Sequence, residues 1–391
     1  MKKFIAMFLA VAMMAALFAG CGSDGAETTA PGAENDGASA AIKIGVCGPL
    51  TGGAAVYGTA VKAAAEIAVE EINALGGLQL ELRAQDDEHD AEKAVNAYNA
   101  LKDWGMQVLA GTVTSAPCLA VAPECYNDGI FMLTPSATAD AILDAGDNVF
   151  QLCFKDTAQG TASAEYFAEK FADAKIGVIY DSSDAYSAGI YANFAARCAE
   201  LGLEIVCAEA FTSDNKSDLS TQVTKCQEAN ADLVFLPFYA VEAAQVLTYA
   251  DKIGYEPTFF GCDGMDGILT TEGFDPALAE GLMMLTPFSA DAEDAATQAF
   301  VAKFQEKTGI TPNQFAANTY DVIYSLYKAL TETGCTADMS AEEISAKLVE
   351  WYTTSSFDGL TGTGITWDET GAVSKAPMAV VIENGVYVGV K

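Results

Sequence analysis

Short apolar runs alternate with amphipathic stretches over most of this chain. The runs have the two-residue period of strands, and the stretches between them have the period of about 3.6 residues that is typical of helices. The expected strands are 42–46, 78–84, 107–113, 130–133, 149–154, 175–180, 203–208, 232–236 and 258–261. The expected helices are 60–75, 91–104, 115–127, 160–171, 185–201, 216–229 and 240–253. This alternation predicts an α/β fold with parallel sheets that helices cover on both faces.

The C-terminal part of the chain has a different pattern. Helical periodicity follows helical periodicity at 292–307, 314–332 and 341–352, and strand patterns come afterwards at 364–367 and 378–390. Asn384 and Gly385 lie between alternating apolar residues, which predicts a hairpin with a type I′ turn.

The N-terminus has the pattern of an export signal. Lys2 and Lys3 precede an apolar run that ends at Phe18, and small residues come before Cys21. The run is too short and too poorly flanked for a stable membrane span, so we expect residues 1–20 to be a signal segment. Residues 22–39 have no large apolar side chain, which predicts a flexible tether over 21–41. The fold should then begin near Ile42.

Size and charge narrow the function. About 350 residues follow the tether. A single hydrophobic core rarely stabilises a chain of this length, so we expect two lobes. The chain has 54 Asp and Glu against 20 Lys and Arg, which argues against nucleic acid or an anionic membrane face as partner. Arg83 and Arg197 are its two arginines. A ligand carboxylate would therefore be held by backbone dipoles, hydroxyls or lysine.

Beyond Cys21 the chain has nine cysteines, an odd number with no CxxC pair: Cys47, Cys118, Cys125, Cys153, Cys198, Cys207, Cys226, Cys262 and Cys335. Most lie inside apolar runs. We interpret most of them as small core residues, and a disulfide framework is the alternative.

Four loops that follow expected strands combine small residues with hydroxyls or a carboxylate. These loops are 48–53 with Tyr57 just after it, 111–116, 134–138 and 261–264. In open parallel sheets, ligands bind at the carboxyl ends of strands. Small residues let a ligand approach the backbone, and free N–H groups at a helix start can hold a carboxylate. We expect the binding site at these loops.

These residues resemble the branched-chain amino-acid-binding proteins, the type I periplasmic solute receptors of ABC importers, from Ile42 to about Val390. The motifs that carry the resemblance are Gly48-Pro49-Leu50-Thr51-Gly52 with Tyr57-Gly58, Glu71-Ile72-Asn73-Ala74-Leu75-Gly76-Gly77, Asp86-Asp87, Thr134-Pro135-Ser136-Ala137-Thr138, Tyr180-Asp181 with Tyr186, Gly261 with Asp263-Gly264, and Thr366-Trp367-Asp368 with Gly371. The resemblance implies two Rossmann-like lobes joined by three crossovers near residues 155, 286 and 366. Lobe 1 would comprise 42–155 plus 287–366, and lobe 2 would comprise 156–286 plus 367–391.

The resemblance also implies a set of ligand-binding residues. Its members are Tyr57, Thr114, Ser115, Ser136, Thr138, Tyr186, Tyr239 and Asp263. The hydroxyls at 114, 115, 136 and 138 would meet the α-carboxylate and part of the ammonium group of an amino acid. Asp263 would pair with the ammonium group, Tyr186 and Tyr239 would close over the ligand, and Tyr57 would form an aromatic wall. Helix caps, core aromatics and an ordinary turn are the alternative roles for these side chains.

Two further features bear on this resemblance. Leu17 to Cys21 is similar to a bacterial lipobox, with Phe18 where Leu is commonest, which implies lipidation of Cys21 and anchoring at the cell membrane. An ordinary secretory signal with an incidental cysteine is the alternative. Relatives often have a disulfide between the loops after the second and third strands, whereas this chain has His89, Asp90 and Val113 there.

Enzyme chemistry finds little support in the sequence. His89 is the single histidine, in the charged run 86–90, where solvation or capping explains it. There are no closely spaced metal ligands and no nucleotide-binding motif in a suitable context, so no metal and no cofactor are expected.

We therefore predict a monomeric lipoprotein that captures a branched-chain or other apolar amino acid (leucine, isoleucine or valine) between closing lobes and delivers it to an ABC permease. The alternatives are a receptor for an amide, urea or aromatic acid, a sensing module, and, last, an exported enzyme.

Overall fold

The computed structural model describes residues 40–375 and 378–390. The predicted signal segment 1–20, Cys21 and the predicted tether up to residue 39 lie outside the described residues. Within the described ranges, no helix has both the length and the apolar composition to cross a bilayer. The first strand begins at Ala41, next to the expected start at Ile42.

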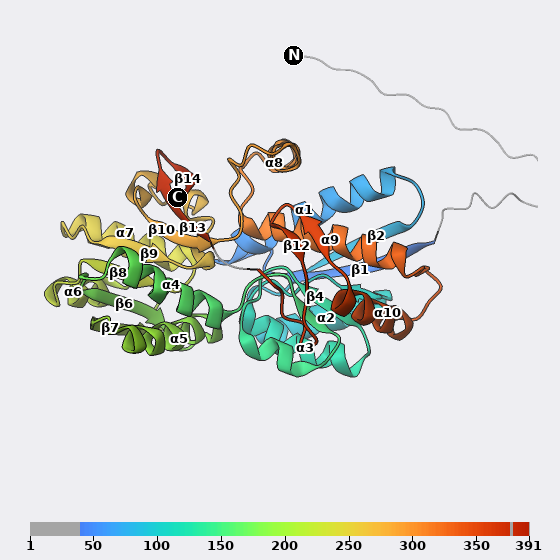
Figure 1. The fold of residues 1–391 in the computed structure, drawn as a ribbon, viewed down its shortest axis with the longest axis horizontal. Coiled ribbons are helices and arrows are strands. Elements are labelled where there is room, and N and C mark those ends of the chain that lie inside the picture. The colour runs from blue at the N-terminus through green and yellow to red at the C-terminus, as the bar shows by residue number, and fades with distance from the viewer. Residues whose placement is uncertain (1–39, 376–377, 391) are drawn as a thin grey trace, which may run out of the picture. The chain divides into compact units, whose positions relative to one another are not determined.

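The first sheet is parallel throughout, with the spatial order β2–β1–β3–β4–β5 (Figure 1). Its strands are β1 (Ala41–Gly48), β2 (Gln79–Asp86), β3 (Val108–Leu109), β4 (Phe131–Thr134) and β5 (Val149–Gln151). Helices α1 (Ala55–Ala74), α2 (Ala91–Trp104) and α3 (Ser115–Asn127) connect them, with a short 3-10 helix η1 (Asp140–Ala145) before β5. Both faces are apolar: Ile42 and Ile44 belong to the same core as α1, whereas Cys47 packs with α2 and α3.

The second sheet has the order β14–β13–β10–β9–β8–β6–β7. Its parallel strands are β6 (Ile176–Asp181), β7 (Ile205–Phe211), β8 (Leu233–Leu236), β9 (Thr258–Gly261) and β10 (Met283–Thr286). An antiparallel hairpin follows, β13 (Met378–Glu383) and β14 (Val386–Gly389). Helices α4 (Asp156–Lys170) and α5 (Ala185–Leu201) pack on one face, and α6 (Ser220–Glu228) and α7 (Ala240–Lys252) pack on the other.

The remaining helices return to the first sheet. These elements are α8 (Ala295–Thr308), α9 (Gln314–Glu332), α10 (Ala341–Thr354) and the small hairpin β11 (Phe357–Gly359) and β12 (Gly362–Ile365). Helix α9 packs along α1, and α10 packs on β4. The chain therefore passes between the two groups of elements after β5, after β10 and after β12. We call the first sheet with α1–α3 and α8–α10 the first-sheet module, and the second sheet with α4–α7 the second-sheet module.

The α/β class and the parallel sheets agree with the sequence prediction, and so does the type I′ geometry at Asn384 (φ 54°) and Gly385 (φ 74°). Several boundaries were wrong. The expected strand 107–113 is reduced to β3. The Ala110 N–H still donates to the Gly45 carbonyl (2.8 Å), but beyond it side chains hold the segment: Thr134 Oγ1 donates to the Thr112 carbonyl (2.6 Å), and Ser136 Oγ donates to the Val113 carbonyl (2.6 Å).

Other elements also differ from the sequence prediction in their presence or in their boundaries. Strand β10 had not been predicted, β7 runs beyond the expected 203–208, and the expected strand 364–367 is part of the β11–β12 hairpin. Helix α1 begins at Ala55, before the expected residue 60. All nine described cysteines have free thiols, and only Cys207 among them is not fully buried, which supports their interpretation as core residues.

Candidate functional site

The eight predicted site residues come together around one cavity, whose other lining residues are Val113, Gly264 and Phe315. The first-sheet module contributes the residues at 57, 114, 115, 136 and 138, and the second-sheet module contributes those at 186, 239 and 263. The space open to the centre of a water-sized sphere is about 10 Å³, enough for about one water molecule. The side chains of the two modules therefore already touch across the site.

Hydroxyl groups and a helix start form the wall on the first-sheet side. Helix α3 begins at Ser115, so its first N–H groups and positive dipole end lie at the cavity. Ser115 Oγ accepts hydrogen bonds from the backbone N–H groups of Thr138 and Ala139, both at 3.2 Å. Thr138 Oγ1 is fully buried and has no hydrogen-bond partner. A hydroxyl in this state is available to an additional group in the cavity.

Thr114 occupies the N-cap position of α3, but its side chain makes no capping bond. Its Oγ1 instead lies 2.9 Å from His89 Nδ1. Simple capping therefore does not account for this residue.

A buried carboxylate faces these groups from the second-sheet side. Asp263 follows β9 and is 3% exposed. Its Oδ1 accepts a hydrogen bond from Tyr186 Oη (2.6 Å), and its backbone N–H donates to Gln159 Oε1 (3.1 Å). Burial raises the pKa of the Asp263 carboxyl to about 6. A cation in the cavity would counter this effect, because an opposite charge favours the ionised form.

Tyr57 links the two modules directly. Its hydroxyl donates to the Gly264 carbonyl (2.6 Å) and accepts from the Ala240 N–H (2.9 Å), and both groups belong to the second-sheet module. Its ring packs against Tyr239 and, edge-on, against Phe315, with centroids 5.4 Å and 5.0 Å away. Tyr239 also stacks on the Tyr186 ring at 5.0 Å. These rings form a continuous aromatic side of the cavity.

His89 was misjudged from the sequence. Capping in the charged run 86–90 comes from Asp90, whose side chain accepts from the Lys93 N–H. His89 is half-buried between the modules: besides the Thr114 contact, its ring meets Tyr239 edge-on at 5.2 Å. Burial lowers the pKa of its imidazole to about 4, so it is neutral at pH 7. The available signal was its position in the loop after β2, at the same edge of the sheet as the loop that carries Thr114.

Two residues at the start of α4 were not predicted at all. Asp156 is 2% exposed, its backbone N–H donates to the Thr138 carbonyl (2.9 Å), and its Oδ1 has no partner. Burial raises the pKa of this carboxyl, and the nearby Asp263 charge adds to the effect. The buried Nε2 of Gln159 has no hydrogen-bond acceptor. Asp156 Oδ1 and Gln159 Nε2 are therefore buried polar atoms without a hydrogen-bond partner, close to Thr138 and Asp263.

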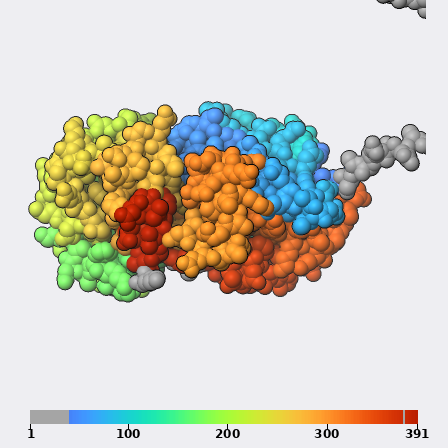
Figure 2. Space-filling view, turned by 90° about the horizontal axis from the view of Figure 1, so that it is seen from above, coloured from blue at the N-terminus to red at the C-terminus, as the bar shows by residue number. Residues whose placement is uncertain are grey.

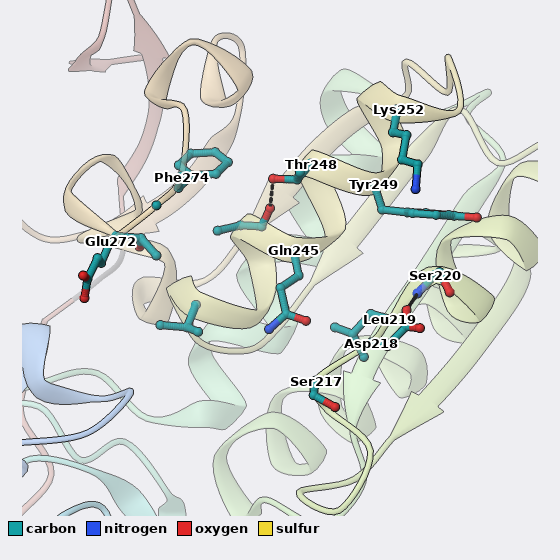
Figure 3. A pocket seen from close by; sticks show the side chains of 14 residues that line it. Ser217, Asp218, Leu219, Ser220, Gln245, Thr248, Tyr249, Lys252, Glu272 and Phe274 are labelled. Atoms are coloured by element: carbon teal, nitrogen blue, oxygen red, sulfur yellow. Dashed lines mark hydrogen bonds between the residues drawn. The ribbon is translucent and has the colours of Figure 1, made fainter.

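Larger cavities lie elsewhere and contain none of the eight predicted residues, and one of them, of about 440 Å³, is lined by Asp140, Lys155 and Glu369 among others. Two more are larger still. One, of about 480 Å³, is formed by α7, residues 217–220 and residues 271–274 (Figure 3). The other, of about 490 Å³, lies between the end of α8 and the β13–β14 hairpin, which are neighbours on the face seen in Figure 2.

Comparisons with known proteins agree on one family. A family model described as "Periplasmic binding protein" matches residues 41–385. The chain is 30% identical over 310 residues to a Leu/Ile/Val-binding protein homolog of Brucella melitensis, covering 78% of this chain and 82% of the relative. It is 29% identical over 337 residues to the leucine-, isoleucine-, valine-, threonine-, and alanine-binding protein of Pseudomonas aeruginosa, covering 84% and 86%.

A solved structure supports the same assignment. The substrate-binding protein LivJ of a branched-chain amino acid transporter from Streptococcus pneumoniae, solved with isoleucine, matches with a TM-score of 0.79 and 28% identity. The match covers 89% of this chain and 97% of that protein. The predicted type I fold with two Rossmann-like halves is thereby confirmed.

Proposed function

Because this chain belongs to the periplasmic binding protein family, we propose that it is the solute-binding protein of an ABC importer and captures a branched-chain or other apolar amino acid. Relatives named for leucine, isoleucine and valine support this ligand class. The observation that carries the proposal is the cavity itself, in which hydroxyls and a helix start on one side face a buried carboxylate on the other. The family consists of binding proteins, so no catalytic role is assigned.

The polar groups of the cavity suit a zwitterion. The α-carboxylate would meet the start of α3 with Ser115 and the unpartnered Thr138 Oγ1. The ammonium group would pair with Asp263, whose raised pKa falls when a cation is bound beside it.

The apolar side of the cavity would receive the ligand side chain once the side chains that now fill it move apart, because the present space admits about one water molecule. Tyr57, Tyr239, Phe315 and Val113 supply aromatic and aliphatic surface there. A pocket of this kind separates ligands that differ by one methylene by only about 1–3 kcal/mol, which fits a receptor for several related amino acids.

Binding would proceed by closure of two lobes, 42–155 plus 287–366 and 156–286 plus 367–391. The Tyr57 contacts with Gly264 and Ala240 support this motion, because they join the two modules at the cavity and would be broken on opening. The permease would recognise the closed form, since closure is the state that ligand binding selects.

We also propose that Cys21 is lipidated and anchors a monomeric receptor at the outer face of the cell membrane. The lipobox-like sequence Leu17 to Cys21 and the polar segment that follows it support this. Tethering would keep the receptor at a high local concentration beside its permease.

Titration calorimetry tests the ligand. Leucine, isoleucine and valine should release or absorb measurable heat and raise the melting temperature, whereas acetamide, urea and benzoate should not. The isosteric variant Asp263→Asn should lose amino-acid binding. Binding of an uncharged amide that survives this substitution would support the alternative of a receptor for another solute, and absence of binding by all three amino acids would reject the proposed ligand class.

A further inference from the structure

Two cysteines in the second-sheet module lie in direct contact. Cys207 on β7 and Cys226 on α6 are 19 positions apart, and their sulfur atoms are 3.4 Å apart. Within residues 40–375 and 378–390, no other two thiols are hydrogen-bonded to each other. Cys226 is fully buried, whereas Cys207 is half-buried and is thus the thiol that a dissolved reagent can reach.

Neighbouring contacts fix the two sulfur atoms in register. Gln222 Nε2 donates to the Ala210 carbonyl (3.1 Å), and the Lys225 ammonium pairs with Glu209 Oε2 (2.7 Å). With the 207–226 contact, these pairs show that α6 runs antiparallel to β7: residues 222, 225 and 226 of the helix meet residues 210, 209 and 207 of the strand. The thiol contact is therefore consistent with the way the helix lies on the edge strand of the sheet.

Other thiols of the chain are engaged differently. Cys47 donates to Asp87 Oδ2 (3.6 Å), and Cys153 donates to the Ala137 carbonyl (3.3 Å). Cys118 and Cys198 are buried among the apolar side chains of the first-sheet and second-sheet modules, respectively. These thiols behave as small core side chains.

We propose that Cys207 and Cys226 are a redox-active pair that forms one reversible disulfide by exchange with a small disulfide such as oxidised glutathione. The Cys207 thiolate attacks a glutathione sulfur and displaces one glutathione thiolate, which leaves a mixed disulfide. The Cys226 thiolate then attacks the Cys207 sulfur and displaces the second. Two protein thiols are oxidised, one glutathione disulfide is reduced to two thiols, and the two protons pass to the departing thiolates.

The cross-link would close the loop between β7 and α6. This loop carries Lys216, which pairs with Glu242 of α7 (2.9 Å), and residues 217–220, which form one wall of the groove in Figure 3. Closing a loop of this length in a chain of this size should raise the melting temperature by about 4 °C. Neither cysteine lines the cavity at Asp263, so the proposal is independent of the proposed ligand.

The test uses the purified full chain, reduced and then incubated with oxidised glutathione at alkaline pH, because burial raises the pKa of both the Cys207 and the Cys226 thiol. Peptide mass spectrometry without reduction should find a peptide pair joined through Cys207 and Cys226, lighter by two hydrogen atoms. The melting temperature should rise and return to its first value after dithiothreitol. Cys207→Ala and Cys226→Ala should each abolish both effects, and the control Cys335→Ala should keep them.

Three results would overturn the proposal. They are the absence of any cross-link in the wild type, a stable glutathione adduct on Cys207 that Cys226 does not displace, and a disulfide joining any other pair of cysteines. The first two need only the wild-type protein, so a variant that folds poorly does not weaken the test.

Discussion

Removing the hydroxyl oxygen of Tyr57 should weaken closure of the two lobes while leaving the other groups of the site in place. In Tyr57→Phe the ring stays in place against Phe315 and Tyr239, but the Gly264 carbonyl and the Ala240 N–H lose their partner. Each buried hydrogen bond contributes about 1 kcal/mol, so the closed arrangement loses about 2 kcal/mol. Because the ligand selects the closed arrangement, leucine affinity should fall about 30-fold.

The hydroxyl of Tyr57 is already used in both directions, as a donor to Gly264 and as an acceptor from Ala240. The loss of affinity would therefore report on closure and not on a contact with the ligand. Calorimetry at fixed pH measures the affinity, and small-angle scattering with saturating leucine measures whether the variant still becomes more compact.

Tyr255→Phe is the matched control. The Tyr255 hydroxyl donates to the Ala231 carbonyl (2.7 Å), and both residues belong to the second-sheet module. This variant loses one buried hydrogen bond and so about 1 kcal/mol of stability, with unchanged leucine affinity. Equal affinity losses in the two variants, or no loss in Tyr57→Phe, would refute the assignment of Tyr57 as a contact that stabilises closure.

Four further predictions concern charge, pH and anchoring. Asp263→Asn should lower leucine affinity at least 100-fold, about 3 kcal/mol, since a buried charge pair loses one partner, and calorimetry checks this. Without ligand, the raised Asp263 pKa makes the wild type gain stability as pH falls from about 6 toward its ordinary value, and melting curves of the variant should lack this gain. The lowered His89 pKa has the opposite effect: its contribution is present above the ordinary histidine pKa and is lost as pH falls to about 4, so melting curves of His89→Gln should depend less on pH over that window. Cys21→Ala should abolish incorporation of labelled fatty acid and release the protein from membranes; unchanged labelling would contradict the lipobox interpretation.

Local periodicity accounts for most of what could be predicted of the fold. The alternation of apolar strands and amphipathic helices predicted the parallel sheets, and Asn384-Gly385 predicted the C-terminal hairpin, because turn geometry depends on these two residues alone. The expected strand 107–113 failed because bonds from Thr134 and Ser136 compete with the ladder. Those bonds depend on a strand that is remote in sequence.

The candidate site shows the same division. Resemblance to a family named eight residues that the structure brings around one cavity. It did not lead to Asp156, whose buried and unpartnered oxygen is visible only once α4 lies beside Thr138. It also left His89 as a solvated or capping residue, because the burial of that ring comes from Tyr239 in the other module.

The sequence by itself determined the fold class and the strand-end loops that carry polar residues, and the prediction of an exported lipoprotein rests on the sequence alone. Each of these depends on neighbouring residues, which a linear pattern contains. Only the tertiary structure decided that Tyr57 joins the two modules, that His89 is neutral, and that Cys207 meets Cys226. Burial and hydrogen bonding across large sequence separations set these properties, because desolvation depends on every element packed around a group.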